Sequence, residues 1–103
     1  MKYMHTGMIV DEKLPDMMYV EPLKVWVTDA SKDPYAIELL YFEVDSRMPA
    51  AIQEQTHVAY EVEDIEAAVA GKTMLWDITD LGGNKLAFIY DHDTVVELFQ
   101  PAK

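Results

Sequence analysis

"TVVELFQ", residues 94–100, is the strongest apolar run of the chain, and it carries a glutamate at its centre. Alternate residues of an extended strand share a face, so Glu97 would lie between Val95 and Phe99 on an apolar face. A buried carboxylate is costly unless it is paired, protonated or bound to a metal ion. This strand therefore predicts that Glu97 meets specific partners from elsewhere in the chain.

An internal repeat supplies those partners. "AIELLYF", residues 36–42, also has a glutamate, Glu38, followed by leucine and a further large apolar residue. "HTGMIVDE", from His5, and "HVAYEVED", from His57, each open a strand with a histidine and end it in acids. The order along the chain is therefore histidine, glutamate, histidine, glutamate, which indicates two copies of one unit of roughly fifty residues.

The repeated residue types are those of a metal site. Equivalent residues of two packed copies can converge on one cavity, which would bring together His5, Glu38, His57 and Glu97. Two neutral imidazoles and two carboxylates suit a divalent ion of intermediate softness, such as Zn, Ni, Fe, Mn or Co. Glu43 and Glu61 are rival candidates because they also lie in predicted strands, and Glu61 shares a face with His57.

The composition excludes several classes of function. The chain has 103 residues, enough for one domain, and half of them are hydrophobic. Its formal net charge of −11 argues against binding to nucleic acid or to anionic membranes. The absence of cysteine excludes disulfides and thiolate metal sites. With no targeting segment or apolar stretch of membrane length in the sequence, the expected location is the cytoplasm.

Hydrophobic periodicity predicts mainly short strands. We expect a helix over residues 63–72, which have acids in the first turn and Gly71 at the end, and a short helix from Pro49 in the connector 45–55. Residues 11–22, interrupted by Pro15, are unsuited to a matching helix in the first half. The expected strands are 4–10, 23–29, 36–44, 56–62, 74–80, 85–91 and 94–101.

The chain resembles the vicinal oxygen chelate superfamily of glyoxalases, bleomycin-resistance proteins and extradiol dioxygenases. The resemblance is clearest over residues 37–69, and "HTGMIV" and "VVELFQ" extend it to most of the chain. It implies an α+β, glyoxalase-like single domain over 1–103, with two tandem βαβββ modules, 1–48 and 49–103, in a cupped, mainly antiparallel sheet. The first module is predicted to be shortened, with most of its helix or a strand lost. A homodimer is also implied.

Resemblance to lactoylglutathione lyases implies that His5, Glu38, His57 and Glu97 bind the metal, and that Glu97 or Glu38 acts as the catalytic base. The implied reaction is proton transfer on a small carbonyl or hydroxy substrate, of lyase, isomerase or epimerase type, without an organic cofactor. Scarce basic residues disfavour glutathione and coenzyme A conjugates. One alternative is a metal-free, bleomycin-resistance-like protein that binds a small molecule, for which an acidic cup would suit a cationic aromatic compound. Another is a reduced relative with only an interaction role.

Overall fold

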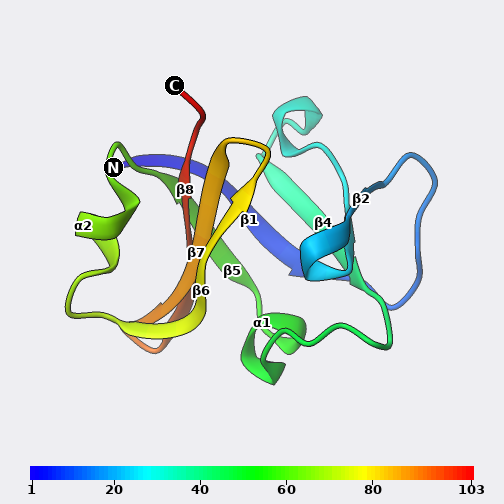
Figure 1. The fold of residues 1–103 in the computed structure, drawn as a ribbon. Helices are drawn as coiled ribbons and strands as arrows, with labels where there is room; N and C mark the ends of the chain where they lie inside the picture. The colour runs from blue at the N-terminus through cyan, green and yellow to red at the C-terminus, as the bar shows by residue number, and fades with distance from the viewer.

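The computed structural model describes residues 1–103 and contains one eight-stranded sheet with two short α-helices (Figure 1). The helices are α1 (Ala50–Glu54) and α2 (Ile65–Val69), and two 3-10 turns are η1 (Glu21–Leu23) and η2 (Ala30–Lys32). No helix is long and apolar enough to cross a membrane. The strands are β1 (Lys2–Ile9), β2 (Met18–Val20), β3 (Val25–Val27), β4 (Ile37–Phe42), β5 (His57–Glu61), β6 (Thr73–Leu81), β7 (Asn84–Asp91) and β8 (Thr94–Gln100).

The strand order β2-β3-β4-β1-β5-β8-β7-β6 repeats one arrangement on both sides of a central pair. In each half the first strand runs parallel to the last, β1 with β4 and β5 with β8, and the other strands pair antiparallel. The halves meet where β1 and β5 pair antiparallel, with Gly7 opposite His57. This mainly antiparallel sheet confirms the predicted α+β, glyoxalase-like fold class.

The two halves differ in the segment after their first strand. Between β5 and β6 the chain forms α2, whose first turn is capped by the Asp64 carboxylate, which accepts a hydrogen bond from the Ala67 amide at 3.3 Å. Between β1 and β2, where Pro15 lies, there is no helix. The first half is therefore shortened as predicted. The first half lacks the helix but has four strands. One of them, β2, was not predicted from the hydrophobic periodicity.

Several element boundaries differ from the predicted ones. The helix predicted over 63–72 covers only Ile65–Val69. The strand predicted over 23–29 begins at Val25, because Leu23 ends the η1 turn and Lys24 takes a left-handed conformation with φ of 51°. The short helix after Pro49 is confirmed as α1.

The apolar core has two parts. The larger joins both halves and includes Val25 and Leu40 from the first half with Phe88 and Val95 from the second, closed by the fully buried Ile52 of α1. The smaller lies beneath α2 and consists of Val62, Ile65, Ala87, Ile89 and Leu98. The first half, which lacks the equivalent helix, has no second cluster of this kind, and its clustered buried residues belong to the core shared between the halves.

Candidate metal centre

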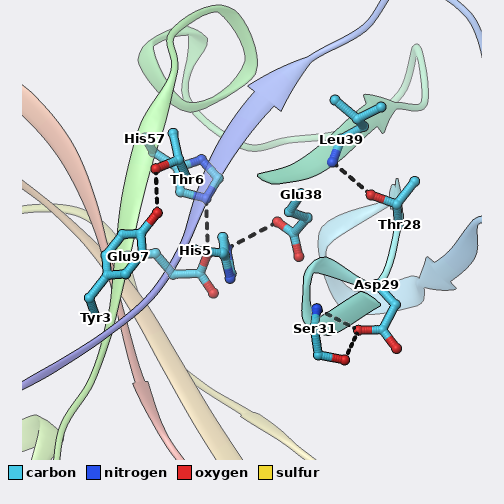
Figure 2. Close-up of polar contacts among 10 residues, drawn as sticks. All are labelled: Tyr3, His5, Thr6, Thr28, Asp29, Ser31, Glu38, Leu39, His57 and Glu97. Carbon is cyan, nitrogen blue, oxygen red and sulfur yellow. Dashed lines mark hydrogen bonds and ion pairs between the residues drawn. The ribbon is translucent and has the colours of Figure 1, made fainter. Parts of the chain in front are cut away.

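The four predicted ligands come together at the middle of the sheet. Glu38, His5, His57 and Glu97 lie on β4, β1, β5 and β8, which are four neighbouring strands. One ligand atom from each side chain lies within 4.8 Å of the other three (Figure 2). Each half therefore contributes one histidine and one glutamate, and the two pairs converge across the β1–β5 junction.

Three contacts define the geometry of the cluster. His5 Nε2 lies 3.2 Å from Glu38 Oε1 and 3.5 Å from Glu97 Oε1, and His57 Nε2 lies 3.1 Å from the same Glu97 oxygen. Ligands bound at about 2.1 Å to one ion are roughly 3.0 to 3.4 Å apart when they are tetrahedral or octahedral neighbours. Two of the three observed separations, 3.1 and 3.2 Å, fall in that range, and the third, 3.5 Å, is slightly longer.

Two ring nitrogens of the cluster lack hydrogen-bond partners. His5 Nε2 is buried at ion-pair distance from two carboxylates, yet it makes no hydrogen bond of good geometry with either. It is therefore open to a metal ion, as a buried polar atom without a partner is costly. His57 Nε2 forms a hydrogen bond with Glu97 Oε1, and its Nδ1 has no partner. That ring lacks the second acceptor that usually orients a ligating histidine.

The carboxylates and imidazoles shift one another's protonation. Burial alone would lower the pKa of His5, but the neighbouring carboxylates of Glu38 and Glu97 raise it to about 10. Burial alone would raise the pKa of Glu97, but its contacts with His5 and His57 hold that pKa below the ordinary glutamate value. In the absence of an ion, the neighbouring carboxylates therefore favour the protonated form of His5.

Gly7 holds the position of His57 and was not identified from the sequence. A Cβ atom placed on Gly7 would lie 2.1 Å from His57 Cε1 and 2.5 Å from His57 Nε2, far inside contact distance. The other three glycines have positive φ angles, whereas Gly7 lies in the ordinary extended backbone of β1. Its lack of a side chain therefore provides space for the imidazole. An isolated glycine inside a strand is the signal that could have shown this close approach.

A cavity of about 570 Å³ opens above the cluster. His5, Glu38 and Glu97 line it, while the fully buried His57 lies behind them, edge-on to Phe88 with ring centroids 5.4 Å apart. Fifteen of the 23 lining residues are hydrophobic, from both halves of the sheet. The polar cluster thus forms one end of an apolar chamber of a size typical for small-molecule sites.

The other candidate residues from the sequence lie outside the four-residue cluster. Glu43 is apart from the cluster and accepts a hydrogen bond from Trp26 Nε1 at 3.0 Å. Glu61 lines the cavity without joining the cluster, so its predicted face is correct. His92, in the turn between β7 and β8, is exposed. Neither tryptophan lines the cavity.

No protein-family profile and no curated protein sequence matches this chain. Solved structures do match. A hypothetical protein from Bacillus halodurans C-125 superposes with a TM-score of 0.70 at 20% identity, covering 99% of this chain and 95% of that one. Methylmalonyl-CoA epimerase from Mycobacterium tuberculosis superposes with a TM-score of 0.66 at 14% identity, covering 99% and 89%. The fold is the glyoxalase-like fold of the vicinal oxygen chelate proteins. At these identities the likeness establishes the fold alone.

Proposed function

We propose that this protein binds a divalent metal ion through His5, Glu38, His57 and Glu97 and catalyses proton transfer on a small carbonyl or hydroxy substrate. One observation carries the proposal: four donor atoms from four adjacent strands lie within 4.8 Å of one another at the end of an apolar cavity. The donor set of two imidazoles and two carboxylates suits Zn, Ni, Fe, Mn or Co.

The surroundings of the two glutamates suggest different roles for them. Both glutamates line the cavity. Glu97 contacts both histidines and its side chain is 10% exposed, so its position is the more constrained. Glu38 contacts only His5, and its side chain is 16% exposed. Glu38 is therefore the better placed to move a proton to and from a bound substrate, while Glu97 holds the cluster together. When bound, the ion would supply Lewis-acid polarisation of a substrate oxygen.

The reaction class follows from this arrangement. A carbonyl oxygen polarised at the cluster acidifies the neighbouring C–H bond, and a carboxylate at the cavity surface can accept and return that proton. Isomerases, epimerases and lyases of this type share the step. The likeness in fold to an epimerase supports epimerisation within this class.

Metal titration of protein purified without chelator tests the proposal. We expect one equivalent of zinc or cobalt(II) to bind at micromolar affinity or tighter. His57→Ala and Glu97→Gln should abolish tight binding, and Glu61→Gln serves as the control because Glu61 lines the cavity outside the cluster. Glu38→Gln should lower substrate-dependent solvent deuterium incorporation by about 10²- to 10⁴-fold. Absence of binding in the unsubstituted protein would exclude the metalloenzyme.

A metal-free binding protein is the second candidate, because the cluster has internal contacts that can hold it without an ion. The hydrogen bond from His57 to Glu97 and the ion pairs of His5 are such contacts. This function predicts thermal stabilisation by an organic ligand in the presence of chelator, and ligand binding that tolerates substitution of His5. The metalloenzyme also allows ligands to occupy the cavity without the ion, but it predicts that chelator or substitution of His5 abolishes substrate-dependent proton exchange.

A further inference from the structure

The charge of the cavity lining restricts the ligand. Eight of the 23 lining residues are not hydrophobic: Lys2, His5, Thr28, Asp29, Ser31, Glu38, Glu61 and Glu97. Four of these are acids and one is a lysine, so the lining is net negative. One divalent ion together with Lys2 supplies three positive charges against four carboxylates, so the lining stays negative when the ion is bound.

The hydroxyl groups of the lining give an anion few donors. Ser31 Oγ already donates its hydrogen to Asp29 Oδ1 at 2.6 Å, whereas Thr28 Oγ1 accepts a hydrogen bond from the Leu39 amide at 2.8 Å and still has its O–H to donate (Figure 2). Lys2 is the only lysine or arginine of the lining, and it lies opposite Glu61 in the register of β1 and β5. An anionic ligand would therefore meet one lysine against four carboxylates.

The rest of the molecule does not supply a phosphate site beside it. Arg47, the single arginine, does not line the cavity. Of the lysines, Lys24 pairs with Asp45 at 2.6 Å and Lys72 with Asp91 at 2.9 Å. A third, Lys13, lies 3.7 Å from the centre of the Trp26 ring. A ligand with several phosphates needs clustered arginines or lysines, and of the eight lysines and arginines only Lys2 lines the cavity.

We infer that the cavity takes a compact, hydrophobic ligand that is cationic or uncharged, and rejects anionic conjugates such as acyl-coenzyme A thioesters. The inference deepens the proposed function and rests on it only in assigning the ligand to the same cavity. The apolar walls hold the body of the ligand, while Asp29 and Glu61, the two lining carboxylates outside the cluster, favour a positive group. The reaction would therefore differ in substrate from that of the epimerase with the similar fold.

Three probes with one hydrophobic body test the inference: phenylbutylamine, phenylbutanol and phenylbutanoate. Binding is measured by calorimetry or by NMR shift perturbation on chelator-treated protein, because a metal ion would itself bind the carboxylate. We expect affinity to fall in that order, with the amine about tenfold or more tighter than the carboxylate at low salt and a smaller ratio at high salt.

Charge-neutral variants locate the effect in the cavity. Glu61→Gln should reduce the amine-to-carboxylate ratio, whereas Asp77→Asn, which removes an exposed charge outside the cavity, should leave it unchanged. Equal binding of amine and carboxylate, no binding of any probe, or an equal effect of both substitutions would overturn the inference. Because no metal is present, these outcomes are independent of the metal titration.

Discussion

Replacement of Gly7 by alanine should displace His57 although none of the four proposed ligands is itself substituted. The added Cβ would lie 2.1 Å from His57 Cε1, 2.5 Å from Nε2 and 2.7 Å from Nδ1. Carbon atoms in contact prefer separations of about 3.5 to 4.0 Å, so the ring or the strand has to move by more than about 1 Å. The ring is fully buried between the rings of Phe88 and His5, which limits its movement.

Two opposing effects set the magnitude. Overpacking of a core by extra methyl groups typically costs about 1 to 3 kcal/mol. Alanine is favoured over glycine within a strand by roughly 0.5 to 1 kcal/mol, which offsets part of that cost. We expect Gly7→Ala to lower the free energy of unfolding by about 1 to 2 kcal/mol. Displacement of His57 Nε2 should also weaken zinc binding, by about 10- to 100-fold, as is typical when the support of a ligand is lost.

A double-mutant cycle separates this clash from other effects of the substitution. Urea unfolding is measured for the unsubstituted protein, Gly7→Ala, His57→Ala and the double variant. With the imidazole removed, alanine at position 7 should cost nothing or stabilise slightly. An equal cost of Gly7→Ala in both backgrounds would falsify the argument that the imidazole occupies the space of a side chain.

Four further predictions concern stability and protons. Ile52→Ala should lower the free energy of unfolding by about 2 to 5 kcal/mol because Ile52 is fully buried, whereas Val44→Ala, at a fully exposed position, should change it by less than about 0.5 kcal/mol. Zinc at a hundred times its dissociation constant should stabilise the fold by about 2.7 kcal/mol in thermal or urea unfolding, and chelator should reverse this. Because the ion must displace the His5 proton, cobalt(II) affinity should rise about tenfold per pH unit from pH 6 to 8.5, and a plateau above pH 7 would contradict the raised pKa. The free energy of unfolding of the metal-free protein should instead fall as the pH rises. The stabilisation that His5 contributes is complete below its pKa in the unfolded chain, about 6.5, and is lost as the pH rises through its folded-state pKa of about 10.

The repeated order of histidine and glutamate, together with the family resemblance, predicted the four side chains that converge, with Glu43 and Glu61 left as rivals. The prediction worked because each residue lies in a strand whose apolar neighbours fix its face, as Val95 and Phe99 do around Glu97. The loss of the first helix could also be predicted, because Pro15 and the charged residues around it leave no apolar helical face in that segment.

Other features depend on contacts between segments distant in sequence. β2 has only three residues, too few for an alternating pattern, and it forms because β3 offers an edge with which it pairs from Met18 to Val20. The role of Gly7 depends on the register that places it opposite His57, which no local pattern specifies. The left-handed conformation of Lys24 likewise could not be predicted, because the apolar alternation of residues 23–29 continues through Lys24 although the strand begins only at Val25.

The antiparallel pairing of β1 with β5 has a consequence for how such a centre can arise. A chain of half this length could build the same four-residue centre as a symmetric dimer, with the ion on the two-fold axis and one histidine and one glutamate from each copy. Joining the copies in one chain frees each to change separately. Here the first copy has lost its helix and retained both of its site residues, because His5 and Glu38 lie on the strands that form the centre of the sheet.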